Sequence, residues 1–251
     1  MEEKYNPFSL EGKVILITGA SSGIGRSTAI MCAKMGATII ATARSEEKLQ
    51  SLIESLHGNN HKYIVADLTS EADRCLVSDL TPNLDGVVFS AGISIRTLLR
   101  QVKEKDIQKV MDINFKAPVI LQKELLKKKK INNDSSLVFI ASRAPFAPVV
   151  GNGIYAASKG ALIAYVKVLS LELANKGIRA NCICPAMVWT DLIIKDAKFT
   201  GANYEELEKQ YPLKRYGQPE DIASLSIYLL SDASSWMTGS CLDITGGSII
   251  S

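Results

Sequence analysis

The chain has 251 residues, of which 47% are hydrophobic and 22% are charged, and its formal net charge is +3. These values are typical of a soluble globular protein. So small a net charge gives no support to a nucleic-acid partner, for which a concentrated basic face is expected.

The amino terminus and the cysteines indicate the compartment. Residues Met1–Tyr5 are acidic and lack an apolar signal core, and no apolar run approaches the ~20 residues that span a bilayer. Five cysteines, an odd count, stand in a chain without a secretory signal. We therefore expect a cytoplasmic protein with no membrane partner. Cys182 and Cys184 have no second pair or histidine beside them, so we interpret them as inert packing thiols and expect no metal site.

Apolar segments alternate with helical patterns along nearly the whole chain. The predicted strands are Lys13–Thr18, Thr38–Ala43, Tyr63–Ala66, Gly86–Ser90, Leu137–Ala141, Arg179–Cys184 and Cys241–Ile244. The predicted helices are Gly23–Lys34, Glu46–Leu56, a short one after Ser70, Lys103–Lys127, Tyr155–Asn175 and Pro219–Leu230. This alternation predicts βαβ units and a parallel sheet. No linker or repeat divides the chain, so we predict one α/β domain over residues 1–251.

A glycine-rich turn joins the first predicted strand to the first helix. Glycines there let the backbone turn tightly and approach phosphate oxygens, which a helix amino terminus also attracts. We expect the turn to bind a dinucleotide through Gly19, Ser21, Ser22, Gly23, Ile24 and Gly25. It is not a Walker loop, because no Gly-Lys-Ser/Thr follows. The alternative is a tight strand–helix connection without a ligand.

The end of the second predicted strand bears on the choice between NAD and NADP. An acidic residue there would bind the ribose hydroxyls and repel a 2′-phosphate. The segment reads Ala41-Thr42-Ala43-Arg44-Ser45, with no carboxylate before Glu46. Because the Arg44 guanidinium offers a fork of donors suited to phosphate, NADP(H) is favoured over NAD(H). The alternative is that Arg44 is an exposed loop residue.

A phenol and an ammonium stand four residues apart in Tyr155-Ala156-Ala157-Ser158-Lys159, on one face of a predicted helix. Carbonyl reduction needs a hydride, a proton donor and a stabiliser of the developing oxyanion. We expect Tyr155 to be the general acid, with its pKa lowered by the Lys159 ammonium. Ser142 would donate a hydrogen bond to the substrate oxygen. The alternative is an amphipathic helix with a surface tyrosine and lysine.

These segments together resemble the short-chain dehydrogenase/reductase family, and the resemblance covers essentially the whole chain. Further matching segments are Asp67-Leu68, Ser90-Ala91-Gly92, Met111-Asp112-Ile113-Asn114, Pro185-Ala186-Met187-Val188-Trp189-Thr190 and Pro212–Asp221. The resemblance implies a single-domain Rossmann-type fold. Its doubly wound parallel sheet has about seven strands, in the order 3-2-1-4-5-6-7, with helices on both faces.

The resemblance also implies roles for residues in these segments. Asp67 and Leu68 would contact the adenine, and Lys159 would bind the nicotinamide ribose. Asn114 would hold a water that relays protons through Lys159. The other expected cofactor contacts are Ser90, Ala91, Gly92, Tyr155, Pro185, Val188 and Thr190. The expected catalytic residues are Asn114, Ser142, Tyr155 and Lys159.

Three positions depart from the family pattern. Ser90 stands where an asparagine is usual, so another group must replace the lost amide. Ala186 stands where a glycine is usual, which requires a negative φ. Thr245 replaces an aspartate before Gly246 and Gly247. None of these changes removes an expected catalytic group.

Two further segments invite interpretation. Residues 189–212 interrupt the strand–helix rhythm with apolar residues and lysines after a strand end, where open α/β sheets bind ligands, so we interpret them as a substrate lid. The run Lys127–Lys130 is favoured at a helix carboxyl terminus, and its plain interpretation is a solvated helix end. The alternative is a docking patch, with Lys176, for an acidic partner.

Length and motifs look most like those of 3-oxoacyl-[acyl-carrier-protein] reductases, whose substrate is a thioester on a carrier protein. A reductase or dehydrogenase of a sugar, polyol or other small alcohol is the alternative. A regulator that senses NADP without turnover is a third possibility, but Asn114, Ser142, Tyr155 and Lys159 all survive. Family members are usually homotetramers, which we expect here, with a dimer as the alternative. The sequence does not give the substrate, the stereochemistry or the physiological direction.

Overall fold

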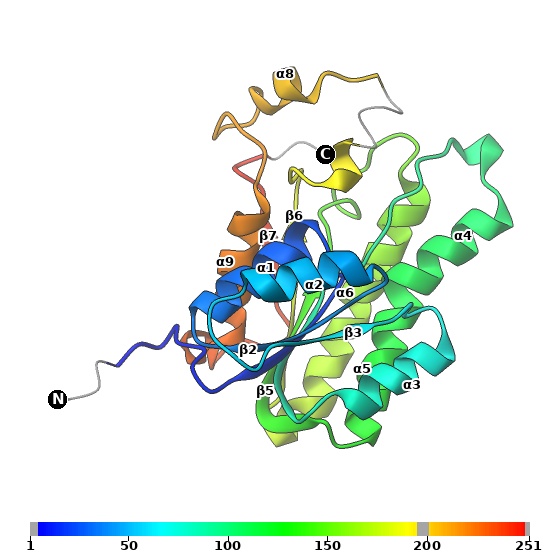
Figure 1. Cartoon of the computed structure of the whole chain (residues 1–251). Helices are drawn as coiled ribbons and strands as arrows, with labels where there is room; N and C mark the ends of the chain where they lie inside the picture. Colours follow the sequence, from blue (N-terminus) through cyan, green and yellow to red (C-terminus); the bar gives the residue numbers. More distant parts are fainter. Residues whose placement is uncertain (1–4, 195–200, 249–251) are drawn as a thin grey trace.

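A seven-stranded parallel sheet forms the centre of the computed structural model, which describes residues 5–194 and 201–248 (Figure 1). The strand order is β3-β2-β1-β4-β5-β6-β7, and every neighbouring pair is parallel. The strands are β1 (Val14–Thr18), β2 (Thr38–Ala43), β3 (Lys62–Val65), β4 (Leu84–Phe89), β5 (Ile131–Ile140), β6 (Arg179–Pro185) and β7 (Cys241–Ile244). The predicted fold class and strand order are therefore confirmed.

Helices cover both faces of the sheet (Figure 1). One face carries α1 (Gly23–Lys34), α2 (Glu46–Ser55) and α9 (Pro219–Leu230). The other face carries α3 (Glu71–Leu80), α4 (Glu104–Met111), α5 (Ala117–Lys127) and α6 (Gly153–Leu173). Alternate strand residues face the two layers, so that Leu16 packs on the second and Ile15 on the first. Burial on both faces explains why the strands read as continuous apolar runs.

The predicted helix over Lys103–Lys127 is interrupted. Helix α4 ends at Met111, a π-helical turn spans Asp112–Lys116, and α5 follows from Ala117. The extra residue in such a turn changes which side chains face inward. Asn114 is buried at this turn. The interruption therefore lies at a residue that the family resemblance had singled out.

Two other elements are longer than predicted. Strand β5 begins at Ile131, six residues before the predicted start, and its register shifts between Leu84 and Gly86 of β4. Because Asn132–Asp134 are polar, the apolar pattern did not predict this part of the strand. Asp134 has a φ of 60°. Helix α3 has 10 residues, and the hydroxyl of Ser70 caps it by accepting a hydrogen bond from the backbone of Asp73.

Helix α6 corrects one expectation from the sequence. Residues Gly153–Lys176 are long and apolar enough to cross a membrane by length and composition, although we had expected no such segment. Leu162, Val166 and Leu169 of this helix are buried in the core against the sheet. Since a core helix of a sheet protein passes the same test, this composition is weak evidence for a membrane span.

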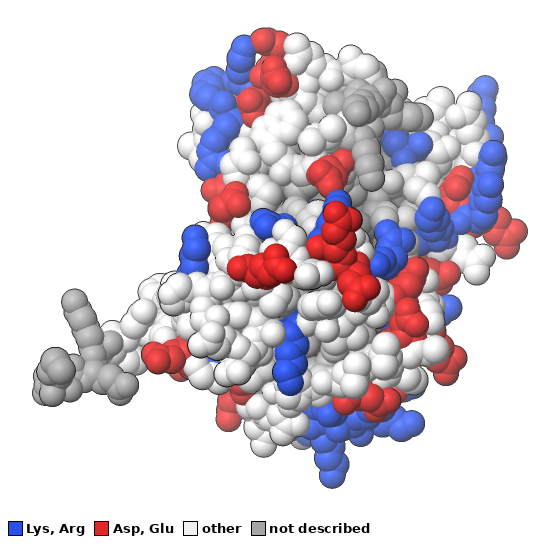
Figure 2. Space-filling view, in the orientation of Figure 1, with Lys and Arg blue, Asp and Glu red and all other residues white. Residues whose placement is uncertain are grey.

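The lysine run Lys127–Lys130 lies at the edge of the sheet where β5 begins. Lys127–Lys130 immediately precede β5, whose 10 residues rise about 3.3 Å each, so roughly 30 Å separates this run from the strand's carboxyl end. Lysine and arginine side chains gather below α5 in Figure 2. Lys128 pairs with Asp79 at 2.7 Å. A partner docked on this run would not reach a site at the opposite edge.

Candidate active site

A cavity of about 910 Å³ opens at the carboxyl ends of the strands. This is the edge at which open α/β sheets bind ligands. Of the predicted cofactor and catalytic residues, all but Gly25 and Asn114 line it. The volume is at the upper end of the range for small-molecule sites. The structure therefore brings together segments that lie far apart in the sequence.

The glycine turn between β1 and α1 leaves no room for side chains. Gly19 has a φ of +67°, and a Cβ built there would lie 2.8 Å from the backbone of Ala91. A Cβ on Gly25 would lie 2.4 Å from the carbonyl oxygen of Gly19. The hydroxyl of Ser22 makes no capping bond to α1. The turn thus forms a bare backbone cradle at a helix amino terminus, which fits a pyrophosphate.

The residues that bear on the choice between NAD and NADP also line this cavity. Arg44 is exposed at the end of β2, and Lys48 of α2 lines the same wall. Asp67 accepts hydrogen bonds from the backbone and hydroxyl of Thr69, at 2.9 and 2.7 Å. These bonds, with a smaller contribution from Arg44, lower the pKa of the Asp67 carboxyl. Arg44 and Lys48 thus add two cationic side chains to the lining of the cavity.

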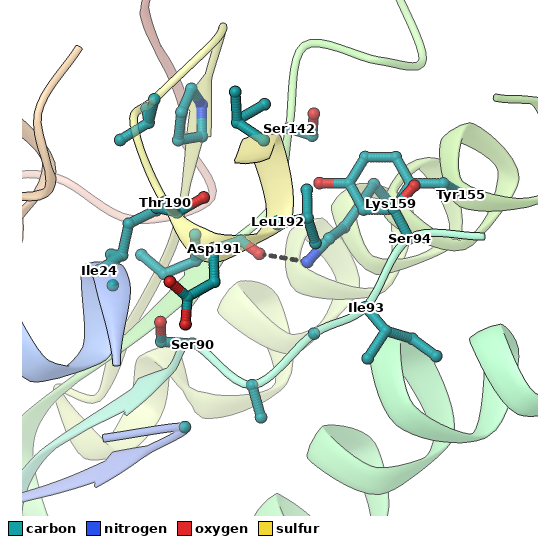
Figure 3. Close-up of a pocket in the computed structure, with 18 of the residues that line it drawn as sticks. Ile24, Ser90, Ile93, Ser94, Ser142, Tyr155, Lys159, Thr190, Asp191 and Leu192 are labelled. Atoms are coloured by element: carbon teal, nitrogen blue, oxygen red, sulfur yellow. Dashed lines mark hydrogen bonds between the residues drawn. The ribbon is translucent and has the colours of Figure 1, made fainter. Parts of the chain in front are cut away.

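Tyr155, Lys159 and Ser142 meet at the inner end of the cavity (Figure 3). Tyr155 and Lys159 come from successive turns of α6, and Ser142 follows β5. The Lys159 ammonium lies 5.8 Å from the centre of the Tyr155 ring and donates a hydrogen bond to the carbonyl of Ile140 at 2.7 Å. The Tyr155 hydroxyl lies near the Ser142 hydroxyl, which acts to lower the pKa of Tyr155. An oxygen-containing substrate placed here would meet two hydroxyl groups at once.

The prediction that Lys159 lowers the pKa of Tyr155 is wrong for this structure. Burial raises the pKa of Tyr155 above that of a free phenol, although the interaction with Ser142 acts in the opposite direction. Burial also lowers the pKa of Lys159 to about 8. Desolvation penalises the charged form of each group, and the sequence alone does not reveal it. Tyr155 is therefore a protonated phenol at neutral pH, which is the form that donates a proton.

Asn114 lies behind these residues. Its side chain accepts a hydrogen bond from the backbone N–H of Ile93 at 2.8 Å and donates to the Ile93 carbonyl at 2.9 Å and to Ser158 at 3.0 Å. A Cβ built on Gly92 would lie 3.4 Å from both the Asn114 Oδ1 and the Lys159 Nζ. Asn114 thus ties the loop after β4 to α6, close to Lys159.

Two departures from the family pattern find a physical explanation. The hydroxyl of Thr18 accepts hydrogen bonds from the backbone of Ser90 at 3.1 Å and Ala91 at 3.3 Å, so the Thr18 side chain holds the turn without an asparagine amide. Ala186 is not among the described residues with positive φ, and its backbone donates to Ile244 at 3.1 Å. The alanine is therefore accommodated without strain.

Several residues that line the cavity were not predicted from the sequence. Ile93 and Ser94 follow the Ser90-Ala91-Gly92 segment, and the Ser94 hydroxyl lies 3.5 Å from Asn152 Oδ1. Asp191 and Leu192 follow Thr190 and were predicted only as part of the interpreted lid, not as individual site residues. Figure 3 shows Leu192 beside Tyr155 and Lys159, and Asp191 farther from Tyr155. Their positions depend on loop conformations, for which the sequence carries no periodic signal.

The interpreted lid contains its own small cluster above the cavity. Residues 191–194 are helical, α8 spans Tyr204–Glu208, and residues 195–200 lie outside the described part of the chain. Glu208 accepts hydrogen bonds from the Trp189 indole at 2.8 Å and from the backbone of Tyr216 at 3.2 Å. The Trp189 and Tyr216 rings pack at 5.5 Å. Tyr204, Tyr211 and Tyr216 of this cluster line the cavity.

The cysteines and acidic residues form no evident metal centre. Within residues 5–194 and 201–248, no group of three His, Cys, Asp or Glu side chains could hold a metal ion. Cys182 and Cys184 are free and buried in β6. Their side chains belong to the core beneath α6.

Comparisons with known proteins agree with this geometry. A family profile described as enoyl-(acyl carrier protein) reductase matches residues 19–248. The 3-oxoacyl-[acyl-carrier-protein] reductase FabG of Rickettsia felis is 36% identical over 241 residues, which cover 96% of this chain and 98% of the relative. The L-xylulose reductase of Caenorhabditis elegans is 30% identical over 246 residues, which cover 96% and 97%. The chain therefore belongs to the short-chain dehydrogenase/reductase family.

Solved structures with a similar fold are named after different sugar substrates. A glucose/ribitol dehydrogenase-type member from Brucella melitensis aligns with a TM-score of 0.89 at 32% identity, covering 96% of this chain and 98% of that one. A candidate NAD(P)-dependent gluconate 5-dehydrogenase from Beutenbergia cavernae aligns with a TM-score of 0.87 at 29% identity, with the same coverage, and was solved with bound NADP at low occupancy. The protein is thus an oxidoreductase of this family.

Proposed function

We propose that the protein is an NADP(H)-dependent reductase of a carbonyl to a secondary alcohol, and that it acts in the cytoplasm. The single observation that carries this proposal is the meeting of Tyr155, Lys159 and Ser142 in one cavity with the glycine cradle. Because all three of these residues are present in the cavity, they argue against a protein that senses NADP without turnover.

The residues of the chain have distinct tasks in this proposal. Bound NADPH supplies the hydride. The cradle of Gly19, Gly23 and Gly25 would hold the pyrophosphate, and Thr190, Pro185 and Val188, which line the cavity, would contact the nicotinamide. Lys159 binds the ribose and orients it. Ser142 donates a hydrogen bond to the substrate carbonyl oxygen, and Tyr155 donates the proton to that oxygen as charge develops.

The substrate that we favour is a 3-oxoacyl thioester of an acyl carrier protein. Its support is the whole-chain similarity to the Rickettsia felis reductase and the apolar, aromatic lining contributed by residues 189–212, which we propose to act as a lid. Lys127–Lys130 lend no support, because they lie at the opposite edge of the sheet. A keto-sugar or other small ketone is the second candidate, supported by the similarity to L-xylulose reductase and sugar dehydrogenases.

A substrate panel tests this function and separates the two candidates. NADPH consumption is followed with acetoacetyl thioesters and with keto-sugars at matched concentrations. We expect the thioester to give the higher kcat/KM. A higher value for a keto-sugar favours the second candidate, and no consumption with any ketone argues for the sensor.

Replacing Arg44 by aspartate should shift the cofactor preference toward NADH. The carboxylate repels a 2′-phosphate and can accept hydrogen bonds from the ribose hydroxyls. Loss of one charged contact predicts a change of about 10-fold or more in the ratio of kcat/KM for NADPH to that for NADH. The same charge change at Lys105, exposed on α4, is the matched control and should leave the ratio unchanged. An unchanged ratio in the Arg44 variant would remove Arg44 from the phosphate site.

The pH dependence of the reduction should report Lys159. Because burial lowers its pKa to about 8, Lys159 is charged below that pH and neutral above it. We expect kcat/KM for ketone reduction to be level at lower pH and to fall as the pH rises through about 8. Tyr155 loses its proton only at higher pH, since burial raises its pKa. A profile that stays level to about pH 10 would contradict the role of Lys159.

We also propose a homotetramer. Helix α6 carries Leu171 and Val168 with exposed fractions of 79% and 54%, and Ile107 of α4 is 43% exposed. Exposed apolar side chains on neighbouring helices are what a subunit interface would cover. Sedimentation equilibrium gives the mass directly, and a dimer is the alternative.

A further inference from the structure

Two cysteine side chains face each other across neighbouring strands at the edge of the sheet. Cys182 of β6 is the register partner of Cys241 of β7, and the backbone N–H of Cys182 donates to Ser240 at 2.8 Å. In-register neighbours of this kind have Cα atoms about 4.8 Å apart, within the range that disulfides span. Both side chains pack in the core beneath α6, so they lie on the same face of the sheet. The backbone therefore already holds the two sulfurs in reach of each other.

The two thiols have different surroundings. Cys182 is completely buried, whereas Cys241 is partly exposed on the edge strand. The interaction between the two thiols, with Lys167 nearby, lowers the pKa of Cys241, and the same interaction together with burial raises the pKa of Cys182. A thiolate is the reactive form of cysteine. Cys241 is thus the accessible nucleophile, with a second thiol directly behind it.

The other cysteines lack this arrangement. Cys184 is two residues from Cys182 on the same face, but its register partner is Asp243, and its thiol lies against the backbone N–H of Ser142. Cys32 is completely buried in the opposite layer, and burial raises its pKa to about 12. Cys75 is in α3, in the helical layer rather than in the sheet. The pair is therefore specific to β6 and β7.

We propose that Cys182 and Cys241 are a reversible disulfide site that responds to hydrogen peroxide. The Cys241 thiolate attacks one peroxide oxygen, the O–O bond breaks, and Cys241 becomes a sulfenic acid with loss of hydroxide. The Cys182 sulfur then attacks the Cys241 sulfur and the S–O bond breaks, with release of water. Overall, two thiols lose two electrons and two protons, and one peroxide is reduced to two molecules of water. A dithiol such as dithiothreitol reverses the bond by exchange.

The bond would join the edge strand to the body of the sheet. Strand β6 ends at Pro185, which lines the cavity and is followed by the lining residues Ala186, Met187, Val188 and Thr190. Ser248, which also lines the cavity, follows β7. The crosslink closes a long loop of chain and restricts the unfolded state. We therefore expect the thermal midpoint of the oxidised protein to exceed that of the reduced protein by about 5 °C.

Peptide mapping of the peroxide-treated folded protein tests the proposal. Free thiols are blocked with iodoacetamide, and the protein is digested with trypsin without reduction. We expect one linked species that joins residues 180–195 to residues 216–251 within one chain, with fragmentation placing the bond on Cys182, and its loss after dithiothreitol. Cys241→Ser and Cys182→Ala should abolish it, whereas Cys184→Ser and Cys75→Ser should retain it.

Three outcomes would overturn the proposal. The first is a bond that fragmentation assigns to Cys184, or that persists in Cys182→Ala. The second is oxidation of Cys241 to sulfinic acid with no linked peptide. The third is a linkage between two chains, which a denaturing gel without reductant reveals. Because fragmentation of the wild-type peptide assigns the sulfurs directly, the test holds even if the Cys182 variant does not fold.

Discussion

Replacing Tyr155 by phenylalanine should reduce kcat for ketone reduction by about 10³-fold, the range of an assigned general acid. The variant loses the hydroxyl that lies near Ser142 but keeps the ring that packs beside the Lys159 ammonium. The nucleotide cradle is built from other segments, so NADPH affinity should stay close to that of the wild type. Stopped-flow kinetics and fluorescence titration of NADPH measure the two quantities separately.

Tyr165→Phe is the matched control for this variant. Tyr165 lies on the same helix, and its hydroxyl donates to Gln122, away from the cavity. Removing that hydroxyl should leave kcat near the wild-type value. Substantial turnover by the Tyr155 variant would mean that another group supplies the proton.

Replacing Gly25 by alanine should both destabilise the fold and weaken NADPH binding. The new Cβ would lie 2.4 Å from the Gly19 carbonyl oxygen and 2.8 Å from its carbon, so the turn must move. Overpacking of this kind costs about 1–3 kcal/mol, which corresponds to a fall in thermal midpoint of roughly 2–4 °C per kcal/mol for a chain of this size. Because the moved backbone is the proposed pyrophosphate cradle, the Kd for NADPH should rise by more than 10-fold.

Gly153→Ala provides the control for the glycine substitution. Gly153 is the first residue of α6, and a Cβ there would meet nothing within 4 Å. Alanine also has the higher helix propensity. We expect an unchanged or slightly raised thermal midpoint and unchanged NADPH affinity. Equal behaviour of the two variants would contradict the steric account of the turn.

The periodic part of the fold could be predicted from the sequence. Helices Gly23–Lys34 and Pro219–Leu230, and strands Thr38–Ala43 and Cys241–Ile244, have the predicted bounds. The two helices and Thr38–Ala43 bury apolar residues against the core, whereas the residues of Cys241–Ile244 are only partly buried or exposed. Where polar residues enter a strand, as at Asn132–Asp134, the apolar pattern failed, because these residues lie in the irregular stretch between the paired residues Ile131 and Ser136. Asn132 is held there by a side-chain hydrogen bond to Asp85 at 2.8 Å.

The candidate site was predictable in its residues but not in its electrostatics. Motif spacing placed Ser142, Tyr155 and Lys159 in one cavity, yet the predicted direction of the Tyr155 pKa was wrong, since burial depends on the whole fold. The π-turn that holds Asn114 and the pairing of Cys182 with Cys241 arise from backbone geometry. Neither leaves a repeating signal in the sequence.

The most direct measurement is the fate of deuterium carried at C4 of the nicotinamide. NADPH labelled on one face or the other of C4 is turned over with the preferred ketone, and the alcohol is analysed by mass spectrometry and NMR. The account predicts that one of the two labelled forms delivers a single deuterium to the former carbonyl carbon, while the other delivers none. An alcohol without deuterium from either form, or deuterium from both in equal measure, would contradict hydride transfer from a cofactor held in this cavity.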